Sequence, residues 1–471
     1  MPLTEWQDTA GYFRRISPLK KLFWLYFLLL IFEGALRKWV FPEYSAPLLL
    51  VRDPIAMLII VEAYRENKWP ERWSLTVGIL AVLLIGLCLL QVVMGNNPWI
   101  AALYGLRSYL LPFPVAFVMG ENLDAEDLRK FGVCSMWLML PETALETAQY
   151  LSPSNSYLNA GAYEGATQIG YAGAHARASG TFSFVVGPGS YGPMVAAFIL
   201  YGLASDKFAR KWLLWAAAFA VLISLPLTGS RSFLVSLGAV VASAGVAAAF
   251  GVSQFLKSLR IIFPLFAVFI LASFLPVFSR SSKDLNERIQ GGSMVEGGGS
   301  FQRAVAHRTV IPLETTILQT DFSSNPIGLG MGRGAAAVTK VLEGRIEFLA
   351  GENEIERAII ELGPFPGVAF TLFRFGLAGW VIFGAISRAR EGESLALLFV
   401  PIMASAVTLG ILEQPTGQGF MVMFLAFSLA ALKPRAIVAS RAPASGRLGR
   451  PILSGGSARY SGSRVAAPKS R

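Results

Sequence analysis

Long apolar stretches separated by short polar turns run through the chain, and they predict its fold. A helix that crosses a bilayer needs about 20 mostly apolar residues, and about twelve stretches of that kind are present. We therefore predict an all-α integral membrane protein, with transmembrane helices 1–9 in residues 21–278 and helices 10–12 in residues 364–432. The predicted spans lie near residues 21–40, 46–63, 74–94, 99–119, 131–150, 185–204, 211–228, 231–251, 261–278, 364–386, 394–412 and 416–432.

The composition agrees with a membrane protein. Of the 471 residues 54% are hydrophobic and only 15% are charged, which is too apolar for a soluble protein of this length. Cys88 and Cys134 both lie within predicted spans, so we interpret them as small core residues rather than as a disulfide or a metal-binding pair. Acidic residues, histidines and cysteines are not spaced as metal ligands, so we expect no metal and no cofactor.

The polar turns alternate between basic and neutral along the chain. Turns after the even-numbered spans carry the cations, and turns on the other side carry almost none besides Arg231. By the positive-inside rule the basic turns are cytoplasmic, so residues 1–20 form a cytoplasmic N-terminus and the C-terminus is cytoplasmic too. Arg37 and Lys38 are the exception, because they follow the first span on the outer side. The basic turns hold Arg65, Lys68, Arg72, Arg129, Lys130, Lys207, Arg210, Lys211, Lys257, Arg260, Arg388 and Arg390.

Three segments lie outside the predicted spans. Residues 151–184 and 279–363 are on the outer side, and the second, a large periplasmic loop, mixes arginines with carboxylates as a folded, ion-paired cap would. Within it, the glycine-rich residues 291–300 are predicted to be mobile. The tail at residues 433–471 is basic and has no acidic residue, which predicts a disordered cytoplasmic segment. It either lies against anionic lipid or is solvated without a specific role.

The charges inside the predicted spans gather in the outer half of the membrane. At about 1.5 Å per residue, Arg52, Asp53 and Arg107 lie one or two turns from the outer surface. An ion pathway would instead distribute its groups through the whole thickness, since each charge in hydrocarbon costs about 2.5 kcal/mol or more. We therefore predict a polar chamber that opens outward. The other charges on this side are Glu142, Glu146, Arg231, Arg374 and Glu413.

Arginines in such a chamber suit a phosphate or diphosphate, because the planar guanidinium donates paired hydrogen bonds and stays charged. Arg231 has the strongest case. Thr228, Ser230 and Ser232 surround it at a predicted helix start, where backbone N–H groups also favour an anion.

Several of these charges also have a structural interpretation. Arg52 with Asp53 would form a local ion pair at a helix end. Glu142 and Glu146, one helical turn apart, would neutralise Arg107 or Arg52. Arg374 would extend its long side chain to the membrane interface.

Four short motifs, in order, resemble those of the O-antigen polymerase and ligase superfamily, which includes exopolysaccharide polymerases. The first is Arg-Ala-Ser-Gly-Thr-Phe at residues 177–182, and the second is Thr-Gly-Ser-Arg-Ser at residues 228–232. The third, Asn-Pro-Ile-Gly-Leu-Gly-Met-Gly, occupies residues 325–332, and the fourth runs from Glu-Asn to Glu-Leu-Gly and a further glycine within residues 352–367. The match covers roughly residues 177–379.

The resemblance implies a GT-C-like helical bundle in the bacterial inner membrane. It implies a polyprenyl-diphosphate-dependent glycosyltransferase that extends a surface polysaccharide or exopolysaccharide on the outer face of that membrane. The glycan would pass from a polyprenyl (undecaprenyl) diphosphate to a sugar hydroxyl, without a metal and with inversion. The implied partners are this lipid-linked glycan, membrane lipid, a chain-length regulator and a flippase. No nucleic acid is expected.

The resemblance also implies roles for single residues. Arg231 would stabilise the departing diphosphate, and Glu352 would accept the proton of the attacking hydroxyl. Ligases of the family have histidine where this chain has Glu352, which favours a polymerase. His175 and His307, the two histidines of the chain, do not occupy that position and are interpreted as structural loop residues. The further predicted contacts to diphosphate or glycan are Arg52, Arg107, Arg177, Arg303, Arg308, Ser230 and Asn353.

Three alternatives remain open. One is an O-antigen ligase that transfers the glycan to lipid A core, since the motifs are shared. Another is a polytopic transporter of an anionic glycolipid, although the one-sided charges and the absence of a repeat between the halves of the chain speak against it. A membrane scaffold leaves the buried arginines unexplained.

Overall fold

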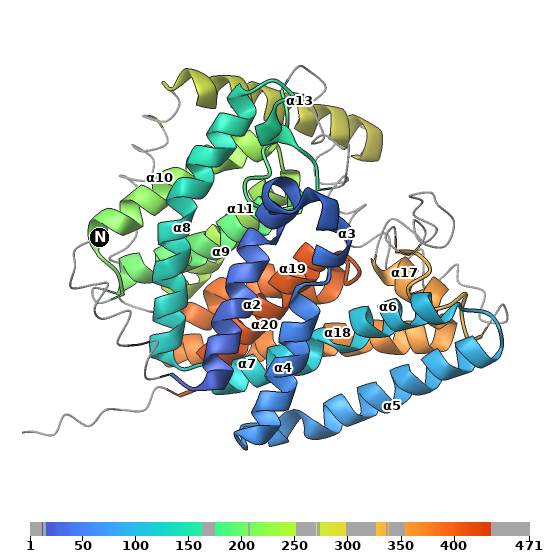
Figure 1. Ribbon diagram of the computed structural model, residues 1–471. Helices are drawn as coiled ribbons and strands as arrows, with labels where there is room; N and C mark the ends of the chain where they lie inside the picture. Colours follow the sequence, from blue (N-terminus) through green and yellow to red (C-terminus); the bar gives the residue numbers. More distant parts are fainter. Residues whose placement is uncertain are drawn as a thin grey trace, which may run out of the picture. The chain divides into compact units, whose positions relative to one another are not determined.

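The computed structural model describes residues 12, 16–162, 175–205, 208–250, 270, 274–297, 326–335, 338 and 354–434. Within these ranges the secondary structure is helical, without a strand (Figure 1). The helices are α2 (Pro18–Ala35), α3 (Ser45–Leu48), α4 (Arg52–Arg65), α5 (Glu71–Val93), α6 (Trp99–Leu110), α7 (Pro112–Asn122), α8 (Ala125–Leu151), α9 (Val186–Ala204), α10 (Lys211–Thr228), α11 (Arg231–Ala249), α13 (Pro276–Gly297), α17 (Glu354–Leu362), α18 (Pro364–Arg390), α19 (Leu395–Leu409) and α20 (Pro415–Ala431), with a π-helical turn at Leu36–Val40 and 3₁₀ turns at Pro42–Tyr44 and Tyr157–Asn159.

Five helical segments in the described part of the chain are long and apolar enough to cross a membrane. They are α5, α6 with α7, α10, α11 and α18, and two shorter apolar helices, α19 and α20, follow. These helices agree with the prediction of an all-α membrane protein. The number of spans and the outer loop stay predictions.

One predicted span was wrong. The span expected at residues 46–63 is interrupted, because α3 ends at Leu48 and α4 begins only at Arg52. At about 1.5 Å per residue, the 14 residues of α4 cover about 21 Å, less than the hydrocarbon thickness of about 30 Å. In the glycine-rich stretch, α13 continues as a helix to Gly297, and the predicted mobility of residues 291–300 stays a prediction. Residues 298–300 lie outside the described ranges.

The position of each apolar helix in the bundle follows from how much of it is covered. Almost every residue of α20 from Pro415 to Ala430 is buried, which explains why this helix is apolar on all its faces. It packs against α7, α9 and α19. In contrast, only 22% of the most apolar part of α5 is buried, so its exposed leucines and valines form a lipid-facing surface.

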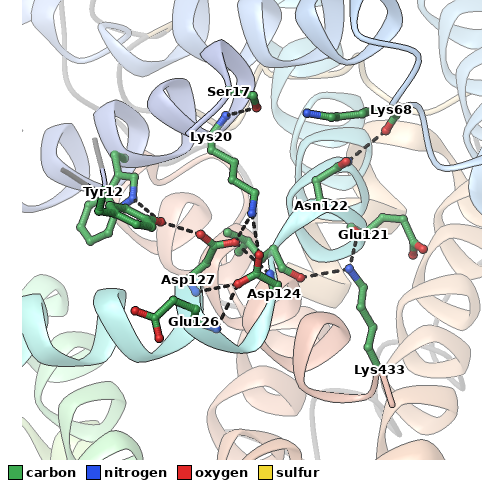
Figure 2. A network of polar contacts seen from close by, with 12 residues as sticks. Tyr12, Ser17, Lys20, Lys68, Glu121, Asn122, Asp124, Glu126, Asp127 and Lys433 are labelled. Atoms are coloured by element: carbon green, nitrogen blue, oxygen red, sulfur yellow. Dashed lines mark hydrogen bonds and ion pairs between the residues drawn. The ribbon is translucent and has the colours of Figure 1, made fainter. Parts of the chain in front are cut away.

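One end of the bundle, here named the basic end, carries Lys20, Lys68, Arg388 and Lys433. Lys20 Nζ lies 2.8 Å from Asp124, and Lys433 Nζ donates to the Leu123 carbonyl at 3.0 Å. Asn122, at the end of α7, donates to the Lys68 carbonyl at 2.9 Å (Figure 2). Arg388 donates to the Lys433 carbonyl at 3.3 Å. Turns far apart in the sequence therefore meet at one place, as the positive-inside rule requires of turns on one side.

Candidate functional site

The first two motifs meet at the other end of the bundle, here named the motif end. Arg177 Nε donates to the Thr228 carbonyl at 3.1 Å, and the Ala178 amide donates to the Leu227 carbonyl at 3.2 Å. Arg177 is buried. The loop before α9 is thereby joined to the turn between α10 and α11, so the two motif segments form one unit.

Helix α8 holds the first motif in place. The Gln149 side-chain oxygen accepts hydrogen bonds from the Ser179 and Gly180 amides at 3.1 and 2.8 Å. Glu142 accepts one from the Thr181 amide at 2.8 Å. Glu146, one turn further along, is buried and faces Ser224 of α10. The expectation that these two glutamates neutralise Arg107 or Arg52 was wrong, because Glu142 binds this loop and the two arginines pair with Asp53 and Glu33 instead.

Gly180 lies where a side chain cannot fit. Its φ is +57°, and a Cβ atom there would come within 1.7 Å of Glu142 Oε1. Gly180→Ala is therefore expected to destabilise the protein by about 1–3 kcal/mol, through left-handed backbone strain and displacement of the Glu142 carboxylate. Thermal unfolding of the purified protein measures this. Gly238→Ala on α11, where the added methyl meets open space, is the control and is expected to be neutral or slightly stabilising. Equal melting temperatures for the two variants would contradict the prediction.

The second motif forms the start of α11. Gly229 adopts the left-handed conformation, with φ of 56°, and ends α10. Ser230 is the N-cap of α11, and its hydroxyl accepts a hydrogen bond from the Phe233 amide at 3.3 Å. Arg231 is the first helical residue and is half-buried. A cation thus lies beside the positive end of a helix, an arrangement that favours an anion between them.

Arg52 is buried in a network with the end of α2. Its Nε lies 2.9 Å from Glu33 Oε2, and another guanidinium nitrogen donates to the Pro415 carbonyl at the start of α20. Arg37 shares the same carboxylate, with Nη1 3.4 Å from Glu33 Oε1. The local ion pair expected between Arg52 and Asp53 was therefore wrong.

Arg107 pairs with Asp53, at 2.5 Å between Nε and Oδ2. Its Nη2 also donates to the side-chain oxygen of Gln418 at 3.2 Å, and Gln418 donates in turn to the Ser108 carbonyl. Arg52 and Arg107 therefore both contact the first turn of α20, but their partners are protein groups. They join α4 and α6 to the first turn of α20.

Arg37 and Lys38 are residues whose role the sequence analysis missed. They contradicted the positive-inside rule because they are buried side chains rather than charges in a loop. Arg37 donates to the Ser183 hydroxyl at 3.0 Å, and Lys38 Nζ donates to the Ser179 hydroxyl at 3.1 Å. Lys38 thus binds the first motif, and Arg37 binds the residue that follows it. The sequence did contain a signal for this role. Glu33 precedes Arg37 by four residues within an apolar run, and this spacing is typical of an ion pair on one face of a helix.

The third and fourth motifs also contact each other. Glu361 accepts hydrogen bonds from the Gly332 and Gly334 amides, each at 2.8 Å, and from the Tyr109 hydroxyl at 3.0 Å. Gln91 of α5 accepts a hydrogen bond from the Met331 amide at 2.9 Å. The described part of the glycine-rich segment is therefore held between α5, α6 and α17, and its glycines allow this close backbone packing.

Arg374 is the largest deviation from expectation among the buried charges. Instead of reaching the interface it is 2% exposed, and it lies 2.9 Å from Glu354 Oε1. It also donates to the Val407 and Gly410 carbonyls at the end of α19. Arg357 pairs with Glu413 nearby. Arg357 thus fixes α17 to the turn between α19 and α20, and Arg374 joins α18 to both α17 and the end of α19.

Four predicted site residues, Arg303, Arg308, Glu352 and Asn353, lie outside the described residues, as does His307. The others, Arg52, Arg107, Arg177, Ser230 and Arg231, all lie at the motif end. In comparisons with known proteins, no family model, no curated protein and no solved structure matches the chain.

Proposed function

We propose that the protein polymerises the repeat units of a surface polysaccharide or exopolysaccharide on the outer face of the inner membrane. It would transfer a glycan from a polyprenyl diphosphate to a sugar hydroxyl. The observation that supports this most is the pairing of the Arg177 segment with the Thr228 turn, because it joins two motifs, each with an arginine, that are distant in sequence. The family resemblance suggests the reaction, and the pairing of the two arginine-bearing segments supports a diphosphate as the group that they bind.

Arg231 is the residue that we assign to the leaving group. When the bond between the anomeric carbon and the phosphate oxygen breaks, negative charge grows on the diphosphate, and a positioned guanidinium stabilises it. The N-terminus of α11, capped by Ser230, adds backbone N–H dipoles of the same sign. Arg177 lies on the paired segment and provides a second cation. Arg52 and Arg107 would support the site indirectly, through their electric field and by fixing the start of α20.

The acceptor hydroxyl must lose a proton as it attacks. The resemblance assigns this step to Glu352, with Asn353 beside it. The same site would serve a ligase if the acceptor were lipid A core, so the identity of the acceptor separates these two functions. A transporter of the same glycolipid would bind the diphosphate and leave the glycosidic bond intact.

Reconstitution into liposomes with lipid-linked repeat units tests the proposal. The wild type is expected to lengthen the glycan, and Arg231→Ala is expected to lower the rate by about 10²–10³-fold, the usual loss when one charge-stabilising donor is removed. Arg65→Ala is the matched control, because Arg65 is 73% exposed at the end of α4. Full activity of Arg231→Ala would refute its role. Transfer to lipid A core would show a ligase, and movement of the lipid without bond formation would show a transporter.

A further inference from the structure

Three titratable side chains from separate elements meet beside the Arg177 segment. His175 Nδ1 lies 3.4 Å from Oδ2 of Asp284, a residue of α13. The hydroxyl of Tyr150, near the end of α8, donates to the same Oδ2 at 2.6 Å. The rings of Tyr150 and His175 are stacked, with centroids 4.6 Å apart and an angle of 17° between planes. None of these residues carries a role in the function proposed above.

This arrangement orients the imidazole. A carboxylate that faces Nδ1 favours the tautomer with the proton on Nδ1, so Nε2 keeps its lone pair and can accept a proton. The Tyr150 ring fixes the plane of the imidazole by stacking, and its hydroxyl fixes the carboxylate. The His175 side chain is 40% exposed, so a substrate hydroxyl can reach it.

His175 lies close in sequence to the segments that carry the two arginines of the proposed diphosphate site. It precedes Arg177 by two residues, which span at most about 7 Å of extended chain. Arg177 in turn is bonded to Thr228, three residues before Arg231 and so at most about 11 Å along the chain. The imidazole and the two arginines therefore belong to the same pair of segments.

We propose that His175, oriented by Asp284 and Tyr150, accepts the proton of the acceptor hydroxyl, in place of Glu352. This inference rests on the proposed glycan transfer. The hydroxyl oxygen forms the new bond to the anomeric carbon while its proton passes to Nε2. The bond from that carbon to the phosphate oxygen breaks, and its electron pair leaves on the diphosphate. The imidazolium then releases its proton to solvent, so no oxidant, metal or further reactant is needed.

Activity measurements test the role of the imidazole directly. In reconstituted liposomes, His175→Gly is expected to lower elongation by about 10²–10⁴-fold, the usual contribution of a general base. Added imidazole is expected to restore part of that rate, because it supplies the missing base in the space left by the side chain. Binding of the lipid-linked donor should stay unchanged. The control is His307→Gln, for which we expect wild-type elongation.

A structural role for the three residues makes a different prediction. If Tyr150, His175 and Asp284 serve only to fasten α13 to α8, His175→Gly will lower the melting temperature, and imidazole will not restore elongation. That result would overturn the assignment of His175. So would a pair of variants in which Glu352→Gln has no elongation activity and His175→Gln keeps it. Neither result affects the proposed function, which fails only if the wild type transfers no glycan. In that case the assignment of His175 fails with it.

The chain has two histidines, so the tautomer of the His175 ring can be measured without an activity assay. In a His307→Gln background, ¹⁵N-labelled histidine gives signals from His175 alone. We expect the neutral imidazole to carry its proton on Nδ1, and a mixture of tautomers after Asp284→Asn. A spectrum that Asp284→Asn leaves unchanged would show that the carboxylate does not orient the ring and would overturn the proposal.

Discussion

Replacing Glu33 by glutamine is expected to lower the free energy of unfolding by about 3–5 kcal/mol, because two buried guanidinium groups lose the carboxylate that they share. Arg52 reaches Glu33 at 2.9 Å and Arg37 at 3.4 Å, and each of the three side chains is at most 4% exposed. Arginine cannot discharge by losing a proton, so neither cation can adapt to the loss. Thermal unfolding of the purified protein in detergent, followed by tryptophan fluorescence, measures the effect.

The control for this substitution is Glu62→Gln on α4. Glu62 also pairs with an arginine, but its partner Arg65 is 73% exposed, so we expect a change of about 0–1 kcal/mol. If both variants melt at the same temperature, the Glu33 network contributes nothing beyond an ordinary surface pair. Because Arg37 contacts the residue that follows the first motif and Arg52 contacts α20, Glu33→Gln is also expected to loosen the motif end.

Glu354→Gln is expected to destabilise the protein more than Arg374→Met does, although the two changes break the same ion pair. Removing one partner of a buried pair costs about 3–5 kcal/mol when the other charge is left uncompensated. The group that remains in each variant differs in whether it can lose its charge by a change of protonation. Burial raises the pKa of Glu354 to about 7 even beside two arginines, so this carboxyl can take a proton once Arg374 is gone. Arg374 stays charged after Glu354→Gln.

The pH dependence of the Arg374→Met variant follows from the same pKa. The folded-state pKa of Glu354 lies above its usual value of 4.5, so the folded state binds the proton more tightly than the unfolded chain does. Its contribution to stability is therefore fully present below pH 4.5 and is lost as the pH rises through about 7. Without Arg374 this loss should be larger and extend to higher pH.

Melting curves of Arg374→Met, Glu354→Gln and the double variant between pH 5 and 9 distinguish these cases. The double variant should recover much of the stability, because no unpaired charge remains. Arg65→Met, at an exposed position, should show no pH dependence beyond that of the wild type. A larger loss for Arg374→Met than for Glu354→Gln at pH 8, where Glu354 is ionised in the wild type, would contradict the reasoning.

Both networks lead to one element, the turn between α19 and α20. Arg374 and Glu354 bind its first part, at Gly410 and Leu412, and Arg357 binds Glu413. Arg52 then binds Pro415 at the start of α20. Since α20 is also the most buried helix, this turn sets the position of the bundle core relative to the motif end. No motif of the family resemblance includes it, so the sequence alone did not indicate its importance.

Sequence alone was sufficient for the fold class and for the distribution of charge. Whether a segment of about 20 residues prefers lipid, and which turns are basic, are properties of local composition. The prediction that Arg52, Arg107 and Arg231 lie on one side followed from counting residues along helices. In the structure Arg52 and Arg107 both contact the first turn of α20, whereas Lys20, Lys68 and Lys433 gather around the end of α7 and the start of α8.

Only the tertiary structure decided which charges pair. Arg52 and Asp53 are neighbours in sequence, but consecutive residues of a helix point in different directions, so one reaches Glu33 and the other Arg107. The His175 cluster is a stronger case, because Tyr150 and Asp284 are 134 residues apart and meet where α13 packs on α10. Pairing depends on the register between helices, which short-range patterns do not contain.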